Sequence, residues 1–194
     1  MRQQMRNQLH ALQQQPVVIA AVRQRLETFI ATFTAQISEL DAEIAAVLQQ
    51  DDAWAATATR LQTITGIGLI TASWLVVATL NFSTCPTPEA ATAYAGLAPR
   101  EQQSGTSIHG RGRIGHTGHA RLRTMLYLAS LSAAHYNPVL RPFYERLLAA
   151  GKSKKLAHCA VARKLVHIAW AVATKGQPFD PAYQHHRRVS SATL

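Results

Sequence analysis

An apolar heptad pattern near the start of the chain constrains the fold more than any other feature. Ile30, Ile37 and Ile44 form one row of apolar residues at seven-residue spacing, and the flanking positions carry Gln, Glu, Thr and Arg. A second row is offset from it by three or four residues and consists of Ile19, Leu26, Phe33, Leu40 and Val47. Two such rows form one stripe along a helix, which is typical of a coiled coil. We predict one long helix over residues 17–50 that pairs with another copy or another helix; the alternative is a core helix of an ordinary bundle.

The remaining residues predict a mainly α fold. Patterns that alternate apolar and polar residues are weak throughout, so the one β element we allow is a short hairpin inside residues 100–116. Glycine, proline and capping residues divide the rest into short helices. The predicted helical segments are 61–80 with a glycine turn inside, 88–96, 119–135, 139–150 and 153–174. We therefore expect a helical arm or coiled coil at 1–57, a compact helical domain at 58–181 and a basic tail at 182–194.

Charge separates the arm from the rest of the chain. Residues 1–53 hold four arginines against six acids, a net charge of −2. The other sixteen basic residues face only four acids, which gives a net charge of +12 over residues 54–194. A basic region of this size is typical of nucleic-acid binding, so we expect the polyanion to bind the second part of the chain.

Cysteine content and hydropathy limit the cellular setting. Cys85 and Cys159 are the only two cysteines, too few for a disulfide framework or a zinc quartet. The first fifteen residues are polar and do not resemble a signal peptide. The longest apolar run, 64–80, contains two glycines and several hydroxyl residues and falls short of the about 20 apolar residues of a membrane span. We expect a cytoplasmic protein with no membrane partner.

Residues 61–75 resemble a helix-hairpin-helix motif. Gly66 and Gly68 enclose one apolar residue between two apolar helical segments, and small residues follow in the second segment. Glycines permit a sharp turn, and the amide groups at the start of the next helix can hold a phosphate without reading sequence. The alternative is a helical hairpin that only packs.

A loop rich in glycine and arginine, residues 99–118, carries the strongest chemical signal. Five arginines lie in or just after it, opposed only by Glu101: Arg100, Arg111, Arg113, Arg121 and Arg123. Arginine forks bind phosphate oxygens in pairs, and glycines let the backbone approach a bulky anion. Ser104 lies in this field and could act as a phosphoryl-transfer nucleophile, with His109, His116 or His119 as its base. The alternatives are a solvated loop and a loop-capping serine.

Two further sets of residues carry side chains that bind ligands in other proteins. Lys154 and Lys155 begin the last helix and are candidate phosphate contacts, against the alternative of a solvated helix face. The three histidines of the loop lack a nearby cysteine or a well-placed carboxylate, so we predict no metal site and no cofactor in this chain. A two-metal nuclease needs clustered carboxylates, and those of residues 54–194 are few and scattered.

Residues 58–181 resemble the C-terminal transposase domain of the insertion-sequence one-ten family, with its one-sixteen and nine-oh-two groups. These are DEDD-type bacterial transposases and recombinases that include pilin-gene invertases. The resemblance rests on the order and spacing of Ile64-Thr-Gly-Ile-Gly, Ala93-Tyr-Ala-Gly-Leu-Ala-Pro-Arg-Glu, Gln103-Ser-Gly-Thr-Ser, Gly110-Arg-Gly-Arg-Ile, Gly118 to Arg123, and Ala162-Arg-Lys-Leu. Residues 1–57 resemble the helical arm that precedes this domain in the family.

The resemblance implies a mechanism shared by two modules. Ser104, with Ser107 as the fallback, would attack a DNA phosphodiester and become linked to the strand for a time. An N-terminal domain with four acidic residues would bind Mg²⁺, and this chain does not contain that domain. The resemblance also implies a structured guide RNA, and assembly with other copies or with full-length transposase through the arm.

We therefore predict the DNA-binding C-terminal part of an insertion-sequence transposase, associated with the bacterial nucleoid and inactive alone. The gene would be truncated, read from an internal methionine, or encode a separate fragment. The alternative is a nucleic-acid-binding remnant without catalysis. A third hypothesis is that the protein is a helix-hairpin-helix adaptor whose resemblance to the family is accidental.

Overall fold

The computed structural model describes residues 1–14, 20–104, 108–113, 115 and 117–182, and for the strands at 100–113 it describes the backbone. The described residues form eight helices and one two-stranded hairpin, which confirms a mainly helical protein. The chain divides into two compact units, Met1–Gln50 and Asp51–Leu194. The sequence placed the boundary seven residues later, at 57/58, inside the first helix of unit 2, α3 (Asp52–Gln62).

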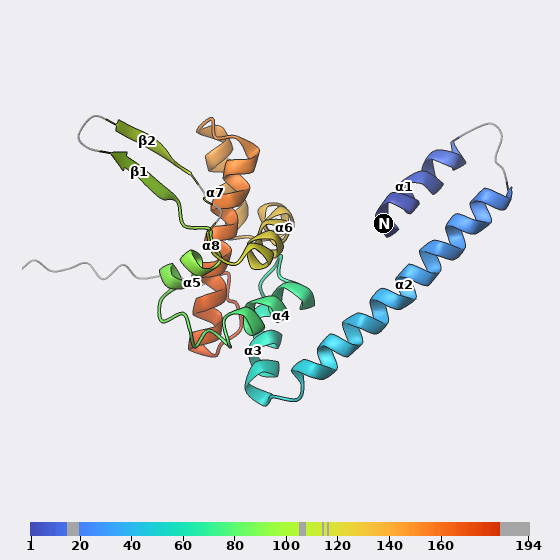
Figure 1. The fold of residues 1–194 in the computed structure, drawn as a ribbon, viewed down its shortest axis with the longest axis horizontal. Coiled ribbons are helices and arrows are strands. Elements are labelled where there is room, and N and C mark those ends of the chain that lie inside the picture. The colour runs from blue at the N-terminus through green and yellow to red at the C-terminus, as the bar shows by residue number, and fades with distance from the viewer. Residues whose placement is uncertain (15–19, 105–107, 114, 116, 183–194) are drawn as a thin grey trace, which may run out of the picture. The chain divides into compact units, whose positions relative to one another are not determined.

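Unit 1 is a pair of helices, α1 (Arg2–Gln13) and α2 (Ala20–Leu48), which pack side by side (Figure 1). The long helix agrees with the prediction. Helix α1 was not predicted, because its sequence is rich in Gln and offers only Met5, Leu9 and Leu12 as an apolar stripe; these three are half-buried. Much of the heptad stripe of α2 stays exposed in a single chain, for example Leu40 at 56% and Val47 at 64%. The coiled coil stays a prediction.

Unit 2 is built around its last helix, α8 (Lys154–Lys175), which packs against α3, α5, α6 and α7 (Figure 1). The other helices of this unit are α4 (Leu69–Ala78), α5 (Pro88–Tyr94), α6 (Ala120–Tyr136) and α7 (Leu140–Ala149). Leu61, Leu126 and Leu165 are among its fully buried side chains. By length and apolar composition alone, α8 is the one helix of the described residues that could cross a membrane. Many of its residues lie in this core, as expected for the central helix of a folded domain.

Capping residues set the start of α5 and both ends of α8 in unit 2. The hydroxyl of Thr87 accepts a hydrogen bond from the Ala90 amide and starts α5. Ser153 caps α8 in the same way through the Leu156 amide. Gly176 ends α8 in the left-handed conformation at φ 66°, which favours glycine. These are the predicted start of the short helix and the predicted ends of the last one.

The hairpin joins α5 to α6 and consists of β1 (Arg100–Ser104) and β2 (Ile108–Arg113) (Figure 1). The strands are antiparallel, with Arg100 opposite Arg113 and Ser104 opposite Ile108. The register shifts between Arg100 and Gln102, so the strand pair is irregular near its base. The arginine-rich loop of the sequence is therefore largely a β-hairpin.

Candidate nucleic-acid interface

Two glycines cross at the base of the hairpin. Gly96 follows α5 at φ 71° and Gly118 precedes α6 at φ 88°, both in the left-handed region. A Cβ added to Gly118 would lie 2.6 Å from the Gly96 Cα, and one added to Gly96 would collide with the Thr117 carbonyl. The His119 amide donates to the Tyr94 carbonyl at 2.7 Å. The two ends of the hairpin segment are thus fixed backbone against backbone.

Side chains from the start of α6 reinforce this crossing. Arg123 donates through Nη1 to the Thr117 carbonyl at 2.8 Å, so this predicted phosphate contact also anchors the loop. His119 caps α6, because its Nδ1 accepts from the Leu122 amide at 3.1 Å. A neutral ring that accepts at Nδ1 carries its proton on Nε2, so His119 in this state has no free lone pair to act as a base. By backbone register His109 lies opposite Gln103, the residue before Ser104.

The hairpin backbone carries the predicted nucleophile and three of the predicted arginines. Ser104 is the last residue of β1, next to the tip of the hairpin. Arg100 and Arg113 form a cross-strand pair at the base, and Arg111 lies between base and tip. The fallback residue Ser107 and the third histidine, His116, lie outside the described residues. The fold therefore groups Ser104 with the arginines of the loop on one two-stranded element.

Gly66 and Gly68 form the turn between α3 and α4, and they differ in what they do there. Gly66 has φ 108°, and a Cβ on it would lie 2.6 Å from the Cβ of Ala133 on α6. The fold itself therefore requires glycine at this position. Gly68 precedes α4 as its N-cap at φ −94°, and a Cβ on it would meet nothing within 4 Å. Packing does not require Gly68, which is exposed and leaves space for a close approach to the first amides of α4.

Asn137 ties this turn to the α6–α7 junction. Its side chain is fully buried, and Nδ2 donates to the Thr65 carbonyl at 3.0 Å. Its Oδ1 accepts from the amides of Val139 and Leu140 and so starts α7. The sequence predicted only that one helix ends near residue 135 and that the next begins near residue 139. The hydrogen bond from Asn137 to the Thr65 carbonyl joins residues seventy-two positions apart, so local sequence patterns do not predict it.

The remaining predicted cations lie on helix ends. Arg121 in the first turn of α6 is exposed, as are Lys154 and Lys155 in the first turn of α8. Within the described part of the chain, the ion pairs are Arg23 with Glu27 and Arg141 with Glu145, so no carboxylate neutralises these three residues. Cations at a helix N-terminus are unfavourably placed against the helix dipole, which makes an anionic partner more favourable there.

Comparison with known proteins identifies the region that carries this geometry. Residues 58–145 match the family model described as Transposase IS116/IS110/IS902 family. The matched segment runs from α3 into α7 and includes the glycine turn, the glycine crossing and the hairpin. It ends before α8, so Lys154 and Lys155 fall outside it.

Relatives of this chain are longer proteins. It is 37% identical over 146 residues to the pilin gene-inverting protein of Moraxella bovis, covering 74% of this chain and 45% of the relative. It is 30% identical over 168 residues to the transposase for insertion sequence element IS1328 of Yersinia enterocolitica, covering 85% and 49%. The Insertion element IS110 protein of Streptomyces coelicolor is 31% identical over 120 residues, covering 62% and 29%. The chain thus spans about half, or less, of the length of these curated relatives.

Two histidines of α8 have shifted pKa values: His158, which is buried, and His167, which is half-buried. Burial lowers the pKa of His158, with His135 acting in the same direction and the Ser130 carbonyl opposing it. Its Nε2 lies 3.2 Å from the Tyr144 hydroxyl. Burial also lowers the pKa of His167; Glu89 opposes this shift, and Arg163 and Lys164 add to it. Both groups therefore favour the neutral form and act as packed side chains.

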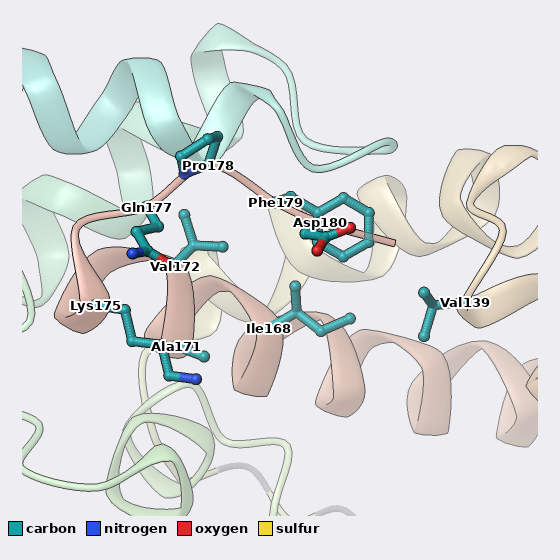
Figure 2. Close-up of a pocket in the computed structure, with 9 residues that line it drawn as sticks. All are labelled: Val139, Ile168, Ala171, Val172, Lys175, Gln177, Pro178, Phe179 and Asp180. Atoms are coloured by element: carbon teal, nitrogen blue, oxygen red, sulfur yellow. The ribbon is translucent and has the colours of Figure 1, made fainter. Parts of the chain in front are cut away.

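One shallow pocket lies where the chain after α8 folds back (Figure 2). It has a volume of about 200 Å³ and is lined mainly by apolar side chains, among them Val139, Ile168, Val172 and Phe179. The Phe179 amide donates to the Thr63 hydroxyl, which holds this segment against the α3–α4 turn. No nucleophile of the sequence motifs lines this pocket. Among the described residues, no three His, Cys, Asp or Glu side chains gather as metal ligands.

Proposed function

We propose that unit 2 is the DNA-binding, strand-transferring part of a transposase or recombinase, with Ser104 as its nucleophile. The observation that supports this most is the overlap of two features. The segment that matches the transposase family is also the segment in which Gly96 and Gly118 fix a hairpin bearing Ser104 and arginines. Fixing the base of a hairpin positions the group at its tip, and positioning is a large part of phosphoryl-transfer catalysis.

In the proposed step, one phosphorus–oxygen bond forms for each one that breaks. The Ser104 Oγ attacks phosphorus and forms an O–P bond while one P–O bond of the DNA strand breaks. The serine proton passes to a base, and the leaving strand ends as a free hydroxyl. Attack by another strand's hydroxyl then reverses the chemistry and releases the serine. Arginines of the hairpin would stabilise the charge that develops on the phosphorus oxygens.

Metal ligands for this reaction would come from outside unit 2. Its acids are Asp51, Asp52, Glu89, Glu101, Glu145 and Asp180. Glu145 is paired with Arg141, and Asp180 accepts from the Ala182 amide. We therefore propose that a domain with clustered acids, in a longer copy of the protein, binds Mg²⁺ and completes the site. Copies would assemble through the α2 arm, and a structured RNA would direct them.

A covalent adduct tests this proposal. The chain is mixed with full-length Moraxella bovis pilin gene-inverting protein in which the aligned serine is replaced by alanine, with Mg²⁺ and labelled DNA of the pilin inversion site. We expect a denaturant-stable protein–DNA band from the wild-type chain and none from Ser104→Ala. Ser83→Ala, an exposed serine elsewhere in unit 2, is the matched control and should keep the band. A band that survives Ser104→Ala contradicts the assignment.

A second candidate function is DNA binding without chemistry. The scarcity of acids in unit 2 favours it, since no three acidic, histidine or cysteine side chains of the described residues gather as metal ligands. This candidate predicts salt-sensitive binding to DNA and no adduct in any pairing with a full-length relative.

A further inference from the structure

Phe143 on α7 brings two cations from different helices together. Its ring is half-buried where α7 packs against α8. The Lys164 Nζ lies 4.5 Å from the ring centroid, and the Arg146 Cζ lies 5.4 Å from it. Each distance is within the range of a cation–π interaction, which contributes about 0.5–1 kcal/mol at an exposed site. The ring therefore restricts both side chains while they remain exposed.

Neither cation has a carboxylate partner in the part of the chain that the structure describes. Glu145 is adjacent to Arg146 in sequence, but its Oε1 accepts from the Arg141 Nε at 2.9 Å. Two like charges near one ring repel each other, and a polyanion bound to both would relieve the repulsion. The two cations are thus suited to contacts with phosphates of a nucleic-acid backbone.

The neighbouring part of α8 adds to the positive potential. Arg163 precedes Lys164, and both act on His167 by lowering its pKa, after the larger effect of burial. Glu89 of α5 is the carboxylate that acts against this charge at His167. Arg163 and Lys164 therefore make this part of α8 positive beside the Phe143 ring.

We propose that Arg146 and Lys164, held on Phe143, form a clamp for the phosphodiester backbone of duplex DNA, separate in sequence from the hairpin. This inference rests on the proposed function, which makes DNA the substrate. The clamp has cations and an aromatic spacer but no group arranged to read a base edge, so it positions DNA without sequence preference. The match to the family model ends at residue 145, before Arg146 and Lys164.

The test measures the salt dependence of DNA binding by the full chain. Binding of a labelled 30-base-pair duplex is followed by fluorescence anisotropy from about 50 to 200 mM KCl. Each lost phosphate contact lowers the slope of log K against log salt by about 0.9. We expect Arg146→Gln with Lys164→Gln to lower it by about 2 and to weaken binding at least tenfold at 100 mM. Both side chains are exposed, and circular dichroism should confirm an unchanged helix content.

Arg141→Gln is the matched control, because Arg141 is an exposed arginine of the same helix that Glu145 already neutralises. It should leave the slope unchanged within about 0.3. Phe143→Leu keeps the apolar volume and both cations but removes the ring, and should weaken binding only a few-fold. An unchanged slope in the Arg146/Lys164 variant, or an equal loss in Arg141→Gln, overturns the clamp.

Two further arms separate the outcomes. A structured RNA of equal charge replaces the duplex in one arm; a loss confined to RNA shows that the clamp is not a DNA site. Arg111→Gln with Arg113→Gln tests the hairpin in the other. If these hairpin substitutions weaken DNA binding and the clamp substitutions do not, the clamp is wrong and the proposed function stands. If the wild-type chain binds no DNA, both proposals fail.

Discussion

The two units bury their apolar residues in different ways. In unit 2 the large aliphatic residues of the core, such as Leu61, Leu126 and Leu165, are fully buried within one chain. In unit 1 the apolar stripe of α2 remains largely open, with Leu40 and Val47 more than half exposed. Burial of apolar surface contributes about 25 cal/mol per Å². The core residues of unit 2 gain this contribution within one chain, whereas the exposed residues of α2 do not. The exposed stripe of α2 is the surface that the predicted coiled coil would cover, whereas the core of unit 2 is already covered within the chain.

The largest expected effect is the destabilisation of unit 2 by Gly118→Val. The substitution forces a β-branched residue into φ 88° and places its Cβ 2.6 Å from Gly96. Left-handed backbone costs about 1–2 kcal/mol and overpacking about 1–3 kcal/mol more, so we expect a loss of about 3 kcal/mol or more. All three tryptophans lie in unit 2, so tryptophan fluorescence during urea unfolding reports this unit selectively.

Gly151→Val is the control for backbone conformation without a clash. Gly151 has φ 72°, but a Cβ on it meets nothing within 4 Å. Its loss should be limited to about 1–2 kcal/mol. Equal losses in the two variants would show that the glycine crossing does not stabilise the unit.

Leu40→Lys with Val47→Lys tests unit 1, the other member of the comparison. These charges should abolish self-association through α2, because a buried lysine in a coiled-coil seam is unfavourable. We expect sedimentation to change from an oligomer to a monomer, and the tryptophan unfolding midpoint to stay the same. Gln36→Lys, an exposed polar position on the same helix, should leave association unchanged. A monomeric wild-type chain would contradict the predicted coiled coil.

Asn137→Ala removes a smaller set of contacts within unit 2. It leaves the Thr65 carbonyl and two α7 amides without their partner. Unsatisfied buried polar groups cost about 1–3 kcal/mol, so we expect a loss in that range in the tryptophan unfolding curve. Ser132→Ala on the exposed side of α6 should change the curve little. A loss below about 0.5 kcal/mol would mean that water replaces the asparagine.

The smallest expected effect is a change in the stability of unit 2 with pH. His158 and His167 have folded-state pKa values below the ordinary value, so the unfolded chain binds more protons than the folded one as pH falls. Their neutral forms stabilise unit 2 above pH about 6.5, and this stability is lost as pH decreases below it. We expect the tryptophan unfolding midpoint to fall between pH 7 and pH 5. The double variant His158→Gln with His167→Gln should show a flatter profile, and an unchanged profile contradicts this account.

Local signals predicted α2 and α4 to α8, but not α1 or most of α3, and they did not predict long-range contacts. The heptads predicted α2, and the predicted helices 88–96 and 153–174 lie within two residues of the bounds of α5 and α8. Capping depends on neighbouring residues, so a sequence reveals it. The clamp partners Arg146 and Lys164 were not predicted as a pair, because they meet through the packing of α7 on α8.

A short hairpin was allowed at the candidate site, but the way in which its base is held was not predicted. The glycines of the loop, residues 99–118, indicated a backbone that can approach a bulky anion. The structure gives Gly118 another role, since Gly118 and Gly96 permit one backbone to cross another. Arg123 was predicted as a phosphate contact and also holds the Thr117 carbonyl. No local pattern distinguishes a glycine that faces a ligand from one that faces another glycine.

The most direct test of the account locates the covalent bond itself. Adduct formed by the wild-type chain with the full-length partner is digested with nuclease and trypsin. Cleavage after Arg100 and Arg111 releases residues 101–111, which contain both Ser104 and Ser107. Tandem mass spectrometry of this peptide should place a nucleotide phosphate on Ser104. A phosphate on Ser107 or on a residue outside this peptide, or an unmodified peptide from purified adduct, would contradict the account.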